Sequence, residues 1–360
     1  MNDKSSGKSS KILGIATNIK HGEKIRIKLK EMRLLEGNYK IEPLKDKILI
    51  PVIRNLSSEE KLLLQQIDPN FEIVQYKFKR QIRRVTDYRE YLKDRINKEL
   101  LKFLPRSFDI IGNIVIIEIP EILIQFENLI GESIIKCLKN IRTVYAKYSG
   151  VSGDFRLRNL RLIGGIDDPI TIHKENNCIF ELNVKKVYFS PRLGSERLRV
   201  VNSVKNGETI IDMFAGVGPY SIQIAKNKVV KVIAFDINPD AIFYLKRNIK
   251  LNKTTLIKPI LGNIRDKIND FQFSADRVIM NLPGSAFEFL DCSCKLISKK
   301  GGVIHYYQFI PSEVKNKEVL NTLENRIKKF GRKIENILFC KKIKQISPTK
   351  SKIAIDIEIK

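Results

Sequence analysis

The ten residues "IIDMFAGVGP", Ile210 to Pro219, run from an apolar, strand-like stretch through an acidic residue into a turn with two glycines. Glycine is favoured where the backbone approaches a ligand closely or adopts a positive φ. A strand, a glycine turn and a helix in this order are typical of the first unit of a nucleotide-binding α/β sheet. The stretch therefore predicts a nucleotide-shaped ligand at the end of a strand, without identifying it.

From about Leu198 onward, strand-like apolar runs alternate with helical windows. The runs are "ETIIDMFA", "VKVIAFDI", "LIKPILGN", "ADRVIMNLP" and "GGVIHYYQF". This alternation predicts an α/β fold with a doubly wound, mostly parallel sheet. Two last runs, "KIENILFCKKI" and "SKIAIDIEIK", have only a loop between them and predict an antiparallel hairpin at the edge of that sheet.

The first half of the chain predicts two smaller α+β units. A basic amphipathic stretch from Gly22 predicts a helix closed by Gly37, followed by short strands up to Val52. The second unit begins with a charged helix, "DYREYLKDRINKELLKFLP", and continues with a strand, "DIIGNIVIIEI", and a helix around Ile134 to Leu138. It closes with strands of period two in "ITIHKENNCIFELNVKKVYFSP".

These changes of pattern predict three domains. Their predicted ranges are 1–75, 76–190 and 191–360. Residues 1–10 are polar and rich in serine and lysine, a composition typical of a disordered end.

The charge of the chain predicts a polyanionic partner. Its 66 Lys and Arg residues against 40 Asp and Glu give a formal net charge of +26, spread along the chain. Nucleic acid fits this field better than a membrane, because no window has the roughly 18 uninterrupted apolar residues of a spanning helix. The first residues have no signal-peptide pattern, so we expect a cytoplasmic protein. Nothing in the sequence requires more than a monomer.

Cysteine and histidine predict no metal site. The five cysteines are too few and too scattered for a disulfide framework, and Cys292 and Cys294 form the only close pair. A single C-x-C pair without nearby histidines is a poor zinc signal, so we interpret both as small, partly buried side chains.

Two features of the glycine turn favour S-adenosylmethionine over a dinucleotide. Gly216 and Gly218 lack the third glycine with which a dinucleotide fold packs its helix against the strand. Asp212 precedes them, where it would repel a pyrophosphate and attract an ammonium and a sulfonium group. Asp236 ends the next strand and can accept hydrogen bonds from ribose hydroxyls.

The fourth strand ends in "NLP", Asn281 to Pro283, which resembles the N-[PL]-P-x turn of amino and RNA-base methyltransferases. At such a turn the asparagine amide oxygen can accept hydrogen bonds from the N–H groups of a planar base. The alternative is that Asp212 caps a helix and that Asn281 is an ordinary turn residue.

Five segments, "VSGDFRLRNLRLIGG", "TIHKEN", "VYFSPRLGSERLRV", "DMFAGVGPYSI" and "NLPGSAFEFLD", together resemble the Trm5-type archaeal and eukaryotic tRNA (guanine-37-N1)-methyltransferases. The resemblance covers nearly the whole chain. It implies a class I, Rossmann-like methyltransferase domain preceded by two RNA-binding domains. The first of these would read the tRNA elbow, and the middle and catalytic domains would hold the anticodon branch.

The chemistry of guanine explains which side chains such a site needs. N1 carries a proton at neutral pH, so a general base must remove it before N1 attacks a methyl group, and negative charge then builds on O6. The resemblance implies that Glu196 is the base and that Arg156 donates to O6. It implies that Asn281 accepts from the exocyclic amine and the N1 edge of a flipped guanine, and that Tyr188 lies near the methyl group.

The resemblance also implies the remaining contacts. Arg197 and Pro283 would contact the substrate, and Arg192 would lie near the donor carboxylate. The other donor contacts would come from Asp212, Phe214, Gly216, Gly218, Asp236, Asn263 and Asn281. The chain departs from the family pattern at "LGNIRD", where Asn263 replaces the acid that binds the adenine amino group. Its amide oxygen can still accept from that amine.

Several other functions stay open or are disfavoured. A wyosine-pathway relative would transfer the aminocarboxypropyl group of the same donor, or methylate C7 of a tricyclic intermediate at the same nucleotide. A cytosine-C5 methyltransferase needs a cysteine nucleophile near the catalytic turn, and "NLPG" has none. A non-catalytic RNA-binding protein would not need the set of two acids, glycines and NLP, and a nicotinamide dehydrogenase would need the third glycine.

Overall fold

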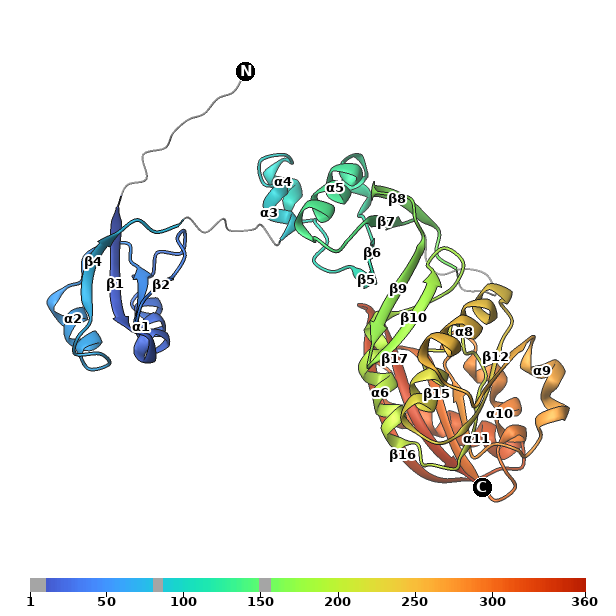
Figure 1. Cartoon of the computed structure of the whole chain (residues 1–360). Helices are drawn as coiled ribbons and strands as arrows, with labels where there is room; N and C mark the ends of the chain where they lie inside the picture. The colour runs from blue at the N-terminus through green and yellow to red at the C-terminus, as the bar shows by residue number, and fades with distance from the viewer. Residues whose placement is uncertain (1–10, 80–86, 149–156) are drawn as a thin grey trace. The chain divides into compact units, whose positions relative to one another are not determined.

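The computed structural model describes residues 11–79, 87–148 and 157–360, which belong to two compact units, Met1–Val85 and Thr86–Lys360 (Figure 1). The ten N-terminal residues, for which we predict disorder, lie outside the described residues, and so does Arg156. The predicted boundary between a middle domain and a catalytic domain at residue 190 falls inside the second unit and stays a prediction.

The first unit is a four-stranded antiparallel sheet of order β2-β3-β1-β4 with two helices. Its elements are β1 (Ile12–Asn18), α1 (Ile19–Glu31), β2 (Glu42–Leu44), β3 (Lys47–Pro51), α2 (Ser58–Gln65) and β4 (Glu72–Tyr76). Strand β1 is not among the predicted strands, and the prediction that the first helix extends to Gly37 is wrong. The helix ends at Glu31, because the chain turns at Arg33, whose φ is +58°.

The second unit begins with a sheet of order β5-β6-β7-β8, packed on three helices. The elements are α3 (Tyr88–Leu92), α4 (Lys98–Leu101), β5 (Asp109–Ile111), β6 (Ile114–Ile117), α5 (Glu127–Cys137), β7 (Thr143–Lys147) and β8 (Leu160–Gly165). The single charged helix that we predict is two short helices, because the side chain of Asn97 accepts from the Glu99 amide and starts a second one. The predicted strand "DIIGNIVIIEI" is a hairpin that turns at Gly112, whose φ is +57°.

A two-stranded hairpin follows, formed by β9 (Ile170–Glu175) and β10 (Cys178–Asn183). Asn176 and Asn177 form its turn with φ of +48° and +60°, which asparagine tolerates better than most residues. Amides of β10 donate to side chains of α8 (Pro239–Asn252), so the hairpin is fixed to the domain that follows.

The largest sheet has seven strands in the order β13-β12-β11-β14-β15-β17-β16. Its strands are β11 (Thr209–Asp212), β12 (Lys231–Asp236), β13 (Ile257–Leu261), β14 (Arg277–Met280), β15 (Gly302–Pro311), β16 (Ile334–Ser347) and β17 (Lys350–Ile359). The strands β13, β12, β11, β14 and β15 are parallel to one another, and β17 lies antiparallel to both β15 and β16. The predicted doubly wound α/β sheet with an antiparallel hairpin is confirmed.

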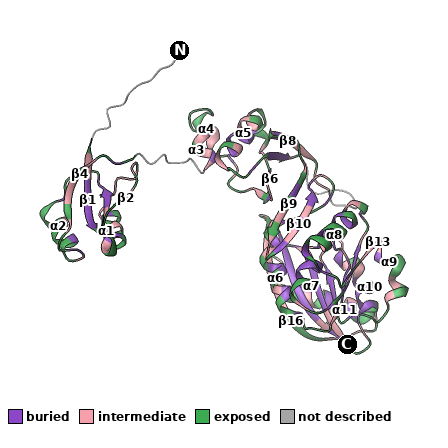
Figure 2. Cartoon of the chain, viewed as in Figure 1, coloured by how far each residue is buried: buried purple, intermediate pink, exposed green. Residues whose placement is uncertain are grey.

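Helices cover both faces of this sheet, and its central strands are buried between them (Figure 2). On one face pack α6 (Gly194–Ser203), α7 (Ser221–Asn227) and α8. The other face carries α9 (Ile264–Lys267), α10 (Leu290–Leu296) and α11 (Asn316–Lys329). Neighbouring residues of β15 therefore pack on opposite faces of the sheet. Tyr307 lies on the face covered by α6, α7 and α8, and Tyr306 lies on the face covered by α9, α10 and α11.

Candidate active site

The glycine turn lies where β12, β11 and β14 reach their carboxyl ends, the usual ligand position in an open α/β sheet. The Gly216 amide donates to the Asp236 carboxylate at 2.7 Å, which ties the turn to the neighbouring strand. Gly216 has φ of +55°, and a Cβ placed on it would meet no described atom closer than the Tyr188 carbonyl oxygen at 3.9 Å. Gly216 therefore borders open space, as a turn that approaches a ligand requires.

Asp212 is completely buried beside this turn. Its Oδ2 accepts from the Ser221 hydroxyl at 2.7 Å, whereas Oδ1 has no hydrogen bond of good geometry among the described residues, although the backbone amides of Phe214 and Ser221 lower the pKa of the carboxyl group. Burial raises the pKa of Asp212 to about 7, against the opposing effect of the Ser221 hydroxyl. A carboxyl group with one oxygen that lacks a hydrogen bond of good geometry is suited to a cationic ligand.

Glu196 lies in the first turn of α6 with 7% of its surface exposed. Arg199, one turn further along, donates from Nε to Oε2 at 2.9 Å and from Nη2 to Oε1 at 2.7 Å. The hydroxyl of Tyr307 donates to Oε1 at 2.7 Å and accepts from the Tyr220 hydroxyl at 3.1 Å. Burial raises the pKa of Tyr307, so this hydroxyl keeps its proton and remains a donor.

Behind Arg199 lies a buried polar network that the sequence analysis missed. Asp356 accepts from Arg199 Nη1 at 2.6 Å and is 2.7 Å from Nδ1 of His305. Nε2 of His305 is 2.8 Å from Arg277 Nη1. Burial lowers the pKa of His305, so the ring is neutral, with Nδ1 donating to Asp356 and Nε2 accepting from Arg277.

Asn281 follows β14 and is contacted by a buried lysine. Nζ of Lys352 donates to the Asn281 amide oxygen at 2.8 Å and lies 4.7 Å from the centre of the Tyr307 ring. Tyr307 therefore connects the two predicted catalytic residues, since its hydroxyl contacts Glu196 and its ring faces Lys352. Lys352 is a second functional candidate that the sequence analysis missed.

Tyr188 is 38% exposed, and its carbonyl oxygen lies next to Gly216. The guanidinium of Arg158 lies 5.6 Å from the centre of its ring. The predicted position of Tyr188 beside the donor is compatible with this arrangement, while Arg156 is outside the described residues.

Two predicted arginines are held by other carboxylates. Arg197 is 2% exposed, and its guanidinium donates to Glu175 at 2.7 Å and to the Ser190 carbonyl at 2.8 Å. Buried and paired in this way, Arg197 is not presented to a substrate. Arg192 donates to Asp109 of β5 at 2.5 Å, so its guanidinium is held by that strand.

The remaining predicted residues lie at element ends. Asn263 caps α9 by accepting from the Arg265 amide at 3.0 Å, which occupies one of the two acceptor positions on the oxygen proposed for adenine. Phe214 packs edge-on against Phe289 at 5.1 Å, and the buried Pro283 accepts from the Phe309 amide at 2.9 Å.

The cysteine pair lies in α10, where both side chains are buried. Burial raises the pKa of the Cys292 thiol to about 11 and that of Cys294 to about 12, so both are unreactive packing residues. Among the described residues, no helix combines the length and the apolar character needed to cross a membrane.

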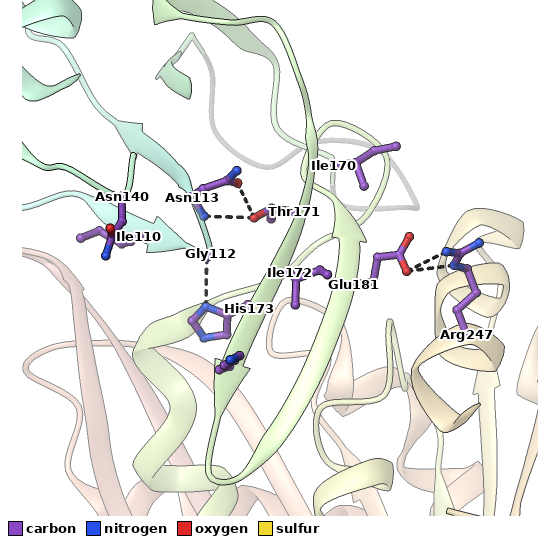
Figure 3. A pocket seen from close by; sticks show the side chains of 11 residues that line it. Ile110, Gly112, Asn113, Asn140, Ile170, Thr171, Ile172, His173, Glu181 and Arg247 are labelled. Carbon is purple, nitrogen blue, oxygen red and sulfur yellow. Dashed lines mark hydrogen bonds and ion pairs between the residues drawn. The ribbon is translucent and has the colours of Figure 1, made fainter. Parts of the chain in front are cut away.

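A hollow of about 830 Å³ lies between the β5–β6 turn and the β9–β10 hairpin, and no predicted site residue lines it (Figure 3). At its wall the Gly112 amide donates to Nδ1 of His173 at 3.2 Å, and the Asn113 amide donates to the Thr171 hydroxyl at 3.1 Å. These contacts join the β5–β6 turn to the β9–β10 hairpin and help to make residues 86–360 one compact unit.

Three family models match consecutive parts of the chain. The TRM5/TYW2 methyltransferase domain matches residues 171–335, the TYW2 N-terminal domain matches residues 88–168, and the tRNA methyltransferase 5 N-terminal domain matches residues 14–60. The tRNA (guanine(37)-N(1))-methyltransferase Trm5b of Pyrococcus abyssi is 43% identical over 347 residues, which cover 96% of this chain and 99% of that protein.

Solved structures show the same likeness. A complex of aTrm5 with tRNALeu matches with a TM-score of 0.75 and 35% identity, covering 96% of this chain and 99% of the other. A crystal structure of M. jannaschii TYW2 with AdoMet matches with a TM-score of 0.56 and 28% identity, covering 71% of this chain and 99% of the other.

Proposed function

Because the chain belongs to the TRM5/TYW2 methyltransferase family, we propose that it transfers a methyl group from S-adenosylmethionine to N1 of guanine 37 in tRNA, with Glu196 as the general base. The supporting observation is the pair of contacts at Tyr307, which link Glu196 to Lys352 and through it to Asn281. A base for N1 and a clamp for the guanine edge are thereby parts of one buried polar cluster.

The glycine turn fits the donor. Gly216 borders open space, and the buried Asp212 has one oxygen without a hydrogen bond of good geometry among the described residues, which suits the positive charge of the methionine moiety. Asp236 accepts from the Gly216 and Asn238 amides and keeps further lone pairs for ribose hydroxyls. When bound, S-adenosylmethionine supplies a methyl group that is electrophilic because it is carried by a sulfonium.

The surroundings of Glu196 direct its remaining basic site. A carboxylate has about four lone-pair positions, and Arg199 and Tyr307 occupy three of them. The position left on Oε2 is available to accept the N1 proton. Three donors also fix the side-chain rotation, so the free lone pair has a defined direction before the substrate arrives.

Asn281 would hold the edge of the flipped guanine, but Lys352 already donates to its amide oxygen. That contact fixes the orientation of the amide and leaves one acceptor position on the oxygen for a guanine N–H. The contact also brings the positive charge of Lys352 near the guanine ring, which becomes electron-rich when its N1 is deprotonated. Arg156 would donate to O6, and Tyr188 would form a wall beside the methyl group.

The tRNA would be bound by both units. We infer that residues 1–75 contact the elbow, and that residues 76–190 and 191–360 hold the anticodon branch. The high positive charge of the chain supports tRNA binding, because phosphate contacts supply much of the affinity of such complexes.

The test is incubation with unmodified tRNA that carries G or A after the anticodon, followed by mass analysis of the nucleosides. We expect methylguanosine only with the G form. If the nucleoside instead gains the mass of an aminocarboxypropyl group, the enzyme catalyses the wyosine-pathway reaction and the proposal of methyl transfer is wrong.

Glu196→Gln tests the base itself. The variant should bind donor and tRNA normally and lose about 10²–10⁴-fold in single-turnover rate, the usual contribution of a general base. A rate equal to that of the wild type would exclude Glu196 from proton abstraction.

A further inference from the structure

The turn that carries Asn281 is held by the strand pair β15–β17 at two points. Nζ of Lys352 donates to the Asn281 amide oxygen at 2.8 Å, and the Phe309 amide donates to the Pro283 carbonyl oxygen at 2.9 Å. Phe309 and Lys352 are directly paired residues of β15 and β17. A single pair of strand residues therefore fixes both the side chain and the backbone of this turn.

Register and burial place Lys352 for this contact. It is 4% exposed and lies on the same face of β17 as Ala354, which packs in the core covered by α6, α7 and α8. Its Nζ lies 4.7 Å from the centre of the Tyr307 ring, a position that favours a cation. Asn281 is only half-buried, so part of this residue remains open to a ligand.

An asparagine amide can present either of two groups to a ligand. Its oxygen accepts and its nitrogen donates, and the two groups are so similar in size that their hydrogen-bond partners decide which lies where. A lysine ammonium has three donors and no acceptor, so the amide atom that faces Lys352 is the oxygen. The second lone pair of that oxygen remains available and has a defined direction.

The two orientations of the amide suit different purines. Guanine has a 2-amino group beside its N1–H, and both are donors that require an acceptor. Hypoxanthine keeps N1–H and O6 but lacks the 2-amino group, and adenine has an acceptor at N1. An amide rotated by half a turn would place its own N–H groups against the donors of guanine.

We propose that Lys352 is a positioning residue that determines specificity: by donating to the Asn281 amide oxygen, it keeps that oxygen as the acceptor for the 2-amino group of the target guanine. This inference rests on the proposed function, in which Asn281 holds the guanine edge. Because Lys352 acts through Asn281, its effect on the reaction depends on the 2-amino group. A lysine that only stabilised the packing around Tyr307 would lower the rates with both purines by one factor.

The main test combines one change in the enzyme with one in the tRNA. The enzyme change is Lys352→Met, and the tRNA change replaces guanosine 37 by inosine, which removes only the 2-amino group. The measured quantity is the ratio of kcat/KM with guanosine to kcat/KM with inosine.

We expect a ratio of about ten for the wild type, the effect of one hydrogen bond, and about one to two for Lys352→Met. The variant should lose about tenfold with guanosine and little with inosine, because inosine never makes the bond. An unchanged ratio in the folded variant would overturn the proposal, and so would a wild-type ratio near one.

Two further substitutions keep the proposal testable if Lys352→Met folds poorly. Lys352→Arg retains a side chain that only donates, so the ratio should stay at about ten whatever the overall rate. Lys352→Gln introduces an amide that donates or accepts, so either orientation of Asn281 is satisfied and the ratio should fall below about three. Equal ratios in these two variants would contradict the proposal.

Lys344→Met is the matched control. Lys344 is the residue of β16 that pairs directly with Lys352, and it is also partly buried. The substitution removes the same type of side chain from the adjacent strand and leaves the contact at Asn281 in place. The ratio should stay at about ten even if tRNA affinity falls, and a reduced ratio would contradict the specific role of Lys352.

Asn281→Ala separates failure of this inference from failure of the proposed function. It should reduce the ratio to about one, because it removes the acceptor itself. If the wild type transfers no methyl group to guanosine 37, or if Asn281→Ala keeps the wild-type ratio, the proposed function of the site fails. If Asn281→Ala lowers the ratio and Lys352→Met does not, only this inference fails.

Discussion

The raised pKa of Asp212 predicts that donor affinity depends on pH. Burial raises this pKa to about 7, so the carboxyl group is protonated in much of the free protein at neutral pH. The donor carries a sulfonium and an ammonium, and both favour the ionised form of a neighbouring carboxyl group. Binding should therefore release a proton and become tighter as the pH rises through 7.

The size of the effect follows from that value. Asp212 is ionised in about a tenth of the molecules at about pH 6 and in about nine tenths at about pH 8. If only the ionised form binds well, the dissociation constant falls about tenfold between these values, which is about 1.4 kcal/mol. At pH 7 about half a proton leaves per donor bound.

Isothermal titration calorimetry in two buffers of different ionisation enthalpy measures both quantities. Asp212→Asn should bind the donor more weakly and lose most of the pH dependence, which separates the protein carboxyl from titration of the donor ammonium. Methylthioadenosine, which lacks both positive charges, should bind with little dependence on pH. A donor affinity that is constant from about pH 6 to about pH 8 in the wild type would refute the assignment.

Three substitutions and a change of salt concentration have defined outcomes. Gly218→Ala should cost about 2–4 kcal/mol of unfolding free energy, because its φ is +89° and a Cβ would lie 2.4 Å from Leu245 Cδ1. Compared with Gly218→Ala, Gly216→Ala should lower the melting temperature less and the donor affinity more. Thermal unfolding and a donor titration measure the two effects. Equal effects of the two substitutions would contradict the roles given to the two glycines. Lys352→Met should reduce the single-turnover rate about tenfold through the lost bond to Asn281 and leave donor affinity unchanged. Affinity for tRNA should fall steeply with salt in a filter-binding series, by about 0.7–0.9 in log–log slope for each phosphate contact, and a flat series would exclude an electrostatic interface.

Most of the large sheet could be predicted because its strands are short apolar runs bounded by turn residues. The carboxyl ends of neighbouring parallel strands meet at one edge, so Asp212, Asp236 and Asn281 could be placed together from the sequence. The helices of the charged segment from Tyr88 to Leu101 were harder to predict. Its periodicity is helical throughout, and only the capping side chain of Asn97 divides it.

The network behind Glu196 could not be predicted, because it depends on register and on packing between distant segments. Arg199 and Asp356 are 157 positions apart along the chain. One signal was present: in "KSKIAIDIEI" Asp356 lies between two isoleucines, and Lys352 precedes it by four residues. Charged residues at such positions of a central strand need buried partners, and the spacing of four puts both on one face of the sheet.

The position of β17 between β15 and β16 has a consequence for biosynthesis. The residues proposed to bind the donor leave the ribosome well before Lys350–Ile359, the strand that carries both Lys352 and Asp356. A nascent chain can therefore contain all the proposed donor contacts before Lys352 is available to donate to Asn281. Competence for methyl transfer would arise only when β17 is inserted between its two neighbours, so an incomplete chain would hold the donor without acting on tRNA.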